Sequence, residues 1–116
     1  MSVIYTHMVK IYLICAEIAG EKLHKIGYTK RTIEQRIKEF KTGNASEFYI
    51  VDSFESQWGT MVEAQLHKIF RDKKVNGEWF DLDEDDIIKF KTMCKQIDSN
   101  LELVSQSSYY LERGKF

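Results

Sequence analysis

The sequence contains no proline and only two cysteines in 116 residues, and both features restrict the kinds of structure and site that it can form. Cys15 and Cys94 are far apart in the chain and have no CxxC motif or Cys/His cluster beside them. This excludes a disulfide framework and a cysteine-based zinc site, and it predicts reduced thiols buried in a core. Because proline is missing, the breaks between elements must be located from Gly, Asn, Ser and Asp.

Long apolar runs are also missing. The longest, such as residues 11–16, are far shorter than the roughly 20 residues that span a bilayer, so we expect no membrane segment. Residues 1–10 lack a basic region followed by an apolar stretch, which predicts a cytoplasmic protein. With 43% hydrophobic and 30% charged residues, the chain has the composition of one globular domain, assigned here to residues 1–116.

Neither sign of charge dominates the sequence. The formal net charge is −1, which argues against a strongly basic nucleic-acid binder. Residues 21–41 nevertheless contain seven Lys or Arg against three Glu, whereas residues 72–102 contain nine acids against five Lys. The first segment predicts a local positive surface suited to a polyanion, and ordinary solvated charge is the alternative.

Apolar segments rich in β-branched and aromatic residues predict three strands, at residues 8–16, 23–28 and 47–54. A turn containing Gly20 separates the first two, so we expect them to form an antiparallel pair. Strands this short need helices to cover their faces. The expected fold class is therefore α+β, with a small three-stranded antiparallel sheet flanked by helices.

Helical spacing of apolar residues predicts helices at residues 32–41 and 61–70, and Thr32 with Gln35 forms a capping pair for the first. A third helix is expected after the cap Asp83, because the apolar residues that follow share one helical face: Ile87, Phe90, Cys94 and Ile97. The acidic run before it is interpreted as the start of this helix, since carboxylates near a helix N-terminus interact favourably with its dipole. The Asn76-Gly77 pair predicts a turn before it, followed by a short extended piece at 78–82. Beyond residue 101 no period is clear, and we expect this tail to dock as an edge segment.

Arg36 interrupts the apolar stripe of the first predicted helix. It lies three residues after Ile33 and four before Phe40, on the side expected to face the sheet. A guanidinium in such a place needs an anion, because arginine cannot lose its charge. A bound phosphate would satisfy it, and an internal salt bridge or a side chain reaching to solvent is the alternative.

Glu63 lies at the border of the apolar face of the second predicted helix, one turn before His67. Carboxylate oxygens suit Mg²⁺, whereas an imidazole suits it poorly. A capping box that joins Thr60 to Glu63 is the alternative, and it fails if the helix begins nearer Ser56.

Tyr12 stands at the centre of the first predicted strand, where a tyrosine usually packs in the core. Beside an arginine and a metal-binding carboxylate, its hydroxyl could accept a proton from water or position that water for attack on a phosphodiester. We therefore expect Tyr12, Arg36 and Glu63 to converge in one pocket, because a catalytic site needs its groups close to one phosphate.

Five motifs follow one another along residues 9–82: Tyr12-Leu13-Ile14, Lys25-Ile26-Gly27-Tyr28-Thr29, Arg36, Glu63 with Leu66-His67, and Gly77-Glu78-Trp79-Phe80. Their order and spacing resemble the GIY-YIG nuclease superfamily, in particular its phage-associated branch. The chain departs from that pattern at three positions. Lys10 replaces the glycine of GIY, Lys25 replaces the tyrosine of YIG, and Phe40 stands where some relatives carry a histidine.

The resemblance implies a divalent-metal-dependent endonuclease that hydrolyses DNA with low intrinsic sequence specificity, in the host cytoplasm if the chain is phage-encoded. It implies nucleic acid as partner, a homodimer as one way to gain specificity, and Mg²⁺ or Mn²⁺ held by Glu63. A non-catalytic module of the same fold, which binds nucleic acid or inhibits a host factor, is the alternative. The implied catalytic residues are Tyr12, Arg36 and Glu63, and the implied supporting or substrate-binding residues are Lys25, Gly27, Tyr28, Lys30, His67 and Glu78.

Overall fold

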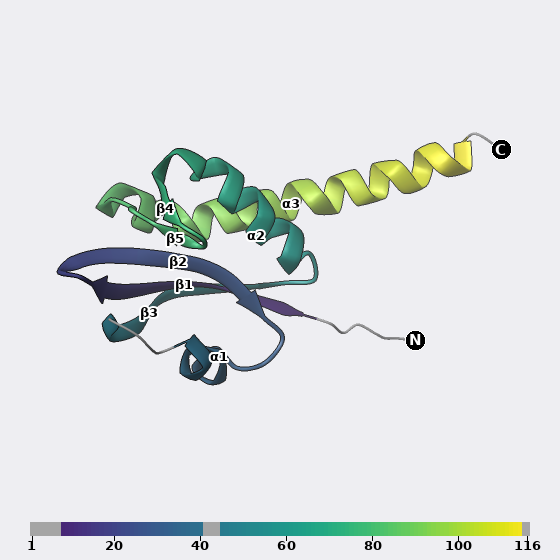
Figure 1. Cartoon of the computed structure of the whole chain (residues 1–116). Coiled ribbons are helices and arrows are strands. Elements are labelled where there is room, and N and C mark those ends of the chain that lie inside the picture. Colours follow the sequence, from purple (N-terminus) through teal and green to yellow (C-terminus); the bar gives the residue numbers. More distant parts are fainter. Residues whose placement is uncertain (1–7, 41–44, 115–116) are drawn as a thin grey trace.

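An antiparallel sheet of five strands runs through the middle of the molecule (Figure 1). The computed structural model describes residues 8–40 and 45–114. The strands lie side by side in the order β3-β1-β2-β5-β4, and all neighbours are antiparallel. Their bounds are β1 (Val9–Ile18), β2 (Glu21–Thr29), β3 (Ala45–Ser56), β4 (Lys74–Asn76) and β5 (Trp79–Phe80).

The α+β class and the antiparallel pairing of the first two strands are confirmed, but the prediction of a three-stranded sheet was wrong. The two additional strands, β4 and β5, have three and two residues, and β5 lies within the short extended piece predicted at 78–82. Strands this short are too brief to display an alternating pattern. The turn between them was predicted, and Gly77 takes a positive φ of 55° there.

The central strand explains the longest apolar run of the sequence. β1 lies between β2 and β3, and its residues 11–16 are buried on both faces of the sheet. A strand covered on both sides reads as a continuous apolar run rather than as an alternation. At its end Ala19 and Gly20 have φ values of 52° and 83°, as a two-residue hairpin turn requires.

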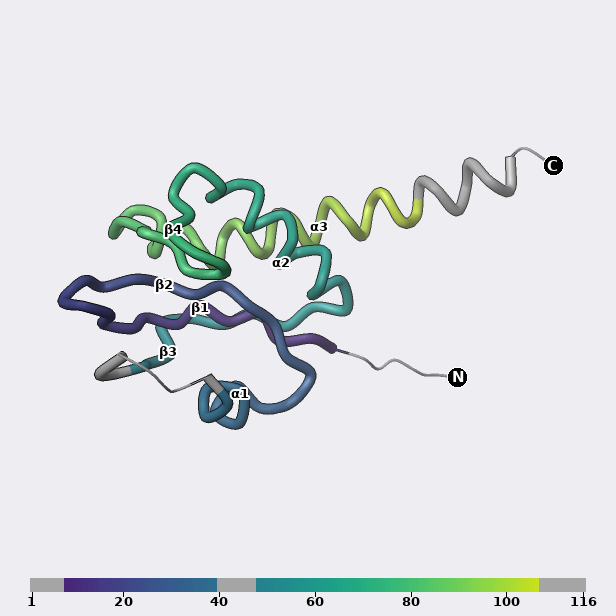
Figure 2. Tube along the Cα trace, viewed as in Figure 1, coloured from purple at the N-terminus to yellow at the C-terminus, as the bar shows by residue number. Residues whose placement is uncertain are grey.

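The helices cover the two faces of the sheet unequally (Figure 1). α1 (Ile33–Phe40) lies on one face, while α2 (Gly59–Ile69) and α3 (Glu84–Gly114) lie on the other. A short 3-10 helix, η1 (Arg71–Lys73), leads from α2 to β4. Figure 2 shows the chain leaving β2 and crossing to the α1 side before it returns to the sheet as β3.

Each face has its own apolar core. The smaller one, under α1, consists of the buried Tyr12, Ile14 and Ile33 with Ile37 and Phe48 packed against them. The larger one lies under α2 and α3, where these two helices pack against the sheet. Its buried members are Ile11, Leu13, Ile26, Val62, Leu66, Phe70, Phe80, Leu82, Phe90, Cys94 and Ile97.

The predicted starts of α1 and α3 are confirmed. Thr32 and Gln35 exchange hydrogen bonds, with the Gln35 amide 3.2 Å from Thr32 Oγ1 and the Thr32 amide 3.3 Å from Gln35 Oε1. Asp83 and Asp86 do the same at the start of α3, at 2.9 and 3.0 Å. The acidic run therefore begins a helix, as expected from its interaction with the helix dipole.

The prediction that the tail docks as an edge segment was wrong, because α3 continues to Gly114. Side chains on its middle turns hold it against the junction of β3 and α2. Glu102 Oε1 accepts hydrogen bonds from Gln57 Nε2 and Trp58 Nε1, both at 2.9 Å, and Leu101 packs on the larger core. Tertiary contacts of this kind extend a helix whose own sequence has a weak period.

Two further expectations concern the cysteines and the membrane. Both cysteines are free and buried, and burial raises the pKa of the Cys94 thiol to about 12. Within residues 8–40 and 45–114 no helix combines the length and apolar character needed to cross a membrane.

Candidate active site

One cavity of about 300 Å³ is lined by side chains from four elements of the fold and one turn. It is lined by Tyr12 of β1, Tyr28 of β2, Arg36 of α1, Glu63 of α2 and Glu78 of the turn before β5. Three of these are the residues expected to converge, and the other two were named as supporting. The structure thus brings them together in space, while the catalytic roles assigned to them stay predictions.

The edge of β2 allows two opposite layers to meet at this cavity. β5 pairs with β2 only at His24 and Lys25, and the Ile26 amide donates to the Glu78 carbonyl at 3.4 Å. Beyond that point β2 has no strand partner on this side among the described residues. Arg36 from the α1 layer and Glu63 from the α2 layer can therefore reach the same space around the strand.

Gly27 leaves the space that the Tyr12 ring occupies. The two residues face each other in the β1–β2 register, and a Cβ atom on residue 27 would lie only 2.4 Å from Tyr12 Oη. Only glycine leaves room for the ring, which is fully buried. The glycine of the Lys25-Ile26-Gly27 motif is thus needed for packing against Tyr12, beside the cavity.

Tyr12 and Arg36 form one electrostatic unit. Burial raises the pKa of the Tyr12 hydroxyl, whereas the positive charge of the Arg36 guanidinium opposes the rise. The carboxylates of Glu78 and Glu63 raise it further. Because the net shift is upward from a value near 10, Tyr12 is protonated at neutral pH, so its hydroxyl can orient a water or a phosphate oxygen.

Arg36 also forms an internal salt bridge, which was the alternative to a bound phosphate. Its Nη1 lies 2.9 Å from Glu39 Oε1, and Arg31 pairs with the other oxygen of Glu39. Hydrogen bonds from Arg31 and then Arg36 lower the pKa of Glu39 below its usual value. The Arg36 side chain is still 34% exposed, so it faces the cavity while Glu39 holds it. Glu39 was not among the predicted site residues, although its position three residues after Arg36 on a helix is a signal for such a pair.

Glu63 is not part of a capping box. α2 begins at Gly59 after Trp58, which provides no side-chain cap, so Glu63 lies in the second turn. Its Oε2 lies 3.2 Å from His67 Nε2, and the same nitrogen lies 2.8 Å from the Ile26 carbonyl oxygen. Because both partners accept, Nε2 carries the hydrogen. The hydrogen bond to Glu63 is the main reason why the pKa of His67 is raised.

His67 therefore orients Glu63 and ties α2 to β2. The Glu63 side chain is only 14% exposed, and its freedom to rotate is limited by this bond. The ring of Phe80 packs edge-on against His67, with 4.9 Å between the ring centroids. The implied supporting role of His67 thus has a geometric basis, since its contact with Glu63 holds that carboxylate at the cavity.

Lys25 and Lys30, the two lysines implied as supporting residues, lie at different places relative to the cavity. Lys25 Nζ lies 2.7 Å from Glu78 Oε1 and 5.6 Å from the centre of the Trp79 ring, and its side chain is 12% exposed. It therefore orients Glu78 at the cavity. Lys30 is exposed and lies outside the set of residues that line the cavity.

The donor set fits a weakly held divalent cation. Glu63 and Glu78 offer carboxylate oxygens to the cavity, and Mg²⁺ commonly uses one or two carboxylates with water and substrate phosphates for the rest. A site made only of protein ligands does not fit, because the described part of the chain has no group of three His, Cys, Asp or Glu that could hold a metal.

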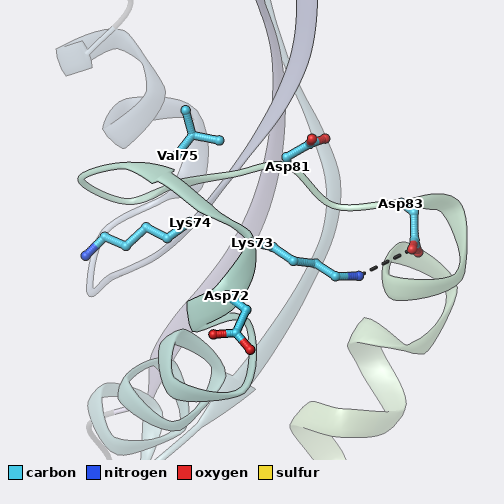
Figure 3. Close-up of a pocket in the computed structure, with 6 residues that line it drawn as sticks. All are labelled: Asp72, Lys73, Lys74, Val75, Asp81 and Asp83. Carbon is cyan, nitrogen blue, oxygen red and sulfur yellow. Dashed lines mark hydrogen bonds and ion pairs between the residues drawn. The ribbon is translucent and has the colours of Figure 1, made fainter.

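A second cavity, of about 490 Å³, lies beside β4 (Figure 3). Lys73 reaches across it to Asp83 at 3.3 Å and also pairs with Asp86. Lys74 points away from that pair. These contacts join η1 to the start of α3, so the charges of this cavity serve to attach the helix.

Comparison with known proteins gives one match. No curated protein and no solved structure matches the chain. The model of the T5orf172 domain matches residues 10–95, a span that contains every residue lining the first cavity. This domain is found in phage proteins and in nuclease contexts of the GIY-YIG and HNH-like kinds. Because the match covers well over half of the sequence, the chain belongs to the T5orf172 domain family.

Proposed function

We propose that this protein is a divalent-metal-dependent nuclease of the GIY-YIG type that hydrolyses phosphodiester bonds in DNA. The observation that carries the proposal is the meeting of Tyr12, Arg36 and Glu63, from three separate elements, around one cavity of about 300 Å³. The nuclease contexts of the family support it. A hydroxyl, a guanidinium and a carboxylate are the groups that metal-assisted phosphodiester hydrolysis uses.

Each group has a distinct part in the proposed reaction. Glu63, with Glu78, would hold Mg²⁺ or Mn²⁺, which when bound polarises the scissile phosphate and stabilises the leaving oxygen. Arg36 would neutralise the charge that develops on the phosphoryl oxygens. Tyr12 would orient the attacking water with its neutral hydroxyl, which agrees with its raised pKa. His67 would keep the Glu63 carboxylate directed at the cavity.

The decisive experiment measures cleavage and affinity side by side. Plasmid and single-stranded DNA are incubated with the wild type, Glu63→Gln and Arg36→Ala, in Mg²⁺, in Mn²⁺ and in chelator. Glu63→Gln should abolish cleavage while DNA affinity stays equal or rises, because a negative charge near the phosphates is removed. Arg36→Ala should reduce the rate on the order of 100-fold or more, as the loss of one preorganised donor commonly does.

Matched controls come from the same structure. Glu34→Gln changes an exposed acid of α1, and Arg71→Ala changes an exposed cation of η1, neither of which lines the cavity. Both should cleave at the wild-type rate. Cleavage that persists in Glu63→Gln would exclude the metal role of this residue.

A non-catalytic nucleic-acid-binding module is the second candidate. The observation that favours it is the pairing of Lys25 with Glu78, because the position that carries the second tyrosine in the resembled superfamily is occupied here by a salt-bridged lysine. Wild-type protein that binds DNA but does not cleave it in the presence of any divalent ion tested would establish this function instead.

A further inference from the structure

The residues that line the cavity differ in how deeply their side chains are buried. Tyr12 at its floor is fully buried, and the Glu63 and Arg36 side chains are 14% and 34% exposed. Tyr28, at 42%, belongs to its mouth. The charged groups that suit a phosphate are therefore the inner ones, and an exposed aromatic ring stands at the entrance.

The volume limits what can enter. About 300 Å³ lies at the lower end of the range for small-molecule sites. A space of that size has room for a single nucleotide unit of one strand, but a base pair with both of its backbones is much larger. For a phosphate to lie at Arg36 while its own base also enters the cavity, the nucleotide must be unpaired or must leave its duplex.

We propose that the cavity takes one unpaired nucleotide, whose base stacks on the ring of Tyr28 while its phosphate meets Arg36. This inference rests on the proposed function and adds a substrate class to it, namely single-stranded or locally opened DNA. Stacking on an aromatic side chain selects for an accessible base face, which duplex DNA does not offer. An exposed tyrosine at the mouth of a phosphate-binding cavity meets that need.

The neighbouring charges provide a path for the rest of the strand. Lys30 and Arg31 follow Tyr28 closely in the chain and are exposed, and Arg31 joins Arg36 through Glu39. Arg31, through its pair with Glu39 of α1, lies on the α1 side of the sheet, whereas the acidic start of α3 lies on the other side (Figure 1). A strand that leaves the cavity is expected to run over the α1 side, away from the acids.

The test separates binding from cleavage by using wild-type protein in chelator. The affinity for a short fluorescent single strand is measured at fixed salt and compared with that for the same strand annealed to its complement. Tyr28→Ala should weaken single-strand binding by about 5- to 150-fold, the loss expected for one stacked base, and Tyr28→Phe should retain it. Tyr49→Ala is the matched control, because Tyr49 is similarly exposed, at 45%, on β3 at the opposite edge of the sheet.

The outcomes keep the two proposals apart. Tighter binding of the single strand, lost in Tyr28→Ala and kept in Tyr49→Ala and Tyr28→Phe, would support the inference even if no divalent ion produces cleavage. Equal affinity for single strand and duplex, or equal losses in Tyr28→Ala and Tyr49→Ala, would overturn it even if the protein cleaves DNA. Unfolding midpoints of each variant show that a loss of affinity does not come from a loss of fold.

Discussion

The two faces of the sheet differ in what covers them. Among the residues that the structure describes, one face carries α2, α3 and a core of eleven buried residues, whereas the other carries α1 and a cluster of three. Tyr12, a residue of the smaller cluster, extends its hydroxyl toward the cavity and interacts with Arg36. Most of the apolar burial thus lies on one face, while the other contributes Tyr12 and Arg36 to the candidate site.

This division has a physical reason. Burial of apolar surface provides most of the free energy of folding, so the large core can stabilise a site whose own groups are polar and partly desolvated. Glu63 lies on α2, which covers the larger core, and it lines the cavity together with Tyr12 and Arg36. The comparison predicts that variants in the large core change stability most and that variants on the α1 side change the site.

The largest effect on stability is expected from the larger core. Phe90→Ala should lower the free energy of unfolding by about 3–5 kcal/mol, because Phe90 is fully buried between α3 and the sheet. Ile37→Ala, in the partly exposed contact of α1, should cost about 1 kcal/mol. Urea unfolding followed by circular dichroism measures both. Equal losses would show that the two faces contribute alike.

Gly27→Ala is expected to act on both stability and the site. The added Cβ would lie 2.4–2.9 Å from three atoms of the Tyr12 side chain, so the ring must move. Overpacking of this kind costs about 1–3 kcal/mol, and cleavage should fall because the hydroxyl is displaced. In a Tyr12→Leu background the stability loss should shrink, which a double-mutant cycle measures. A loss that is the same in both backgrounds would contradict the steric explanation.

Thr32→Ala should affect α1 alone. It removes the capping pair with Gln35 and is expected to cost about 1 kcal/mol of helix stability. Because α1 packs on the smaller core, its backbone amides should exchange with solvent faster while those of α3 keep their protection. Hydrogen exchange by mass spectrometry detects the difference. Faster exchange in α3 as well would mean that the two layers unfold together.

The smallest effect concerns pH and His24. This residue is 5% exposed and pairs in register with Cys15 and Phe80, and burial lowers the pKa of its ring. Asp81 opposes the shift and Lys22 adds to it. Because the folded chain binds the proton less well than the unfolded chain, the stability that the neutral ring contributes is present above the unfolded pKa of 6.5. It is lost as the pH falls toward the lower folded value.

The His24→Gln variant checks this prediction, since glutamine does not titrate. Urea midpoints are compared at about pH 7.5 and about pH 5.5, on either side of the unfolded pKa. The wild type should lose more stability between the two than the variant does. An equal loss in both proteins would assign the pH dependence to other groups.

Local patterns in the sequence determined most elements of this fold. The apolar run of β1, the turn at Gly20, the Thr32–Gln35 cap and the acidic start of α3 were all readable because each depends on residues close together in the chain. The order of motifs along residues 9–82 that suggested a nuclease was readable too, because it requires only the linear sequence. Short-range rules of propensity and capping act within a few residues, so a single sequence displays them.

The tertiary structure decided what depends on distant residues. Neither β4 nor β5 has enough residues to predict its place in the sheet, and the later turns of α3 depend on bonds from Glu102 to Gln57 and Trp58. The link from His67 to the Ile26 carbonyl is likewise a long-range fact, and so is the part of the β2 edge that pairs with no other described strand. They arise from packing between elements, which no local pattern encodes, and they bring Arg36 and Glu63 to one cavity.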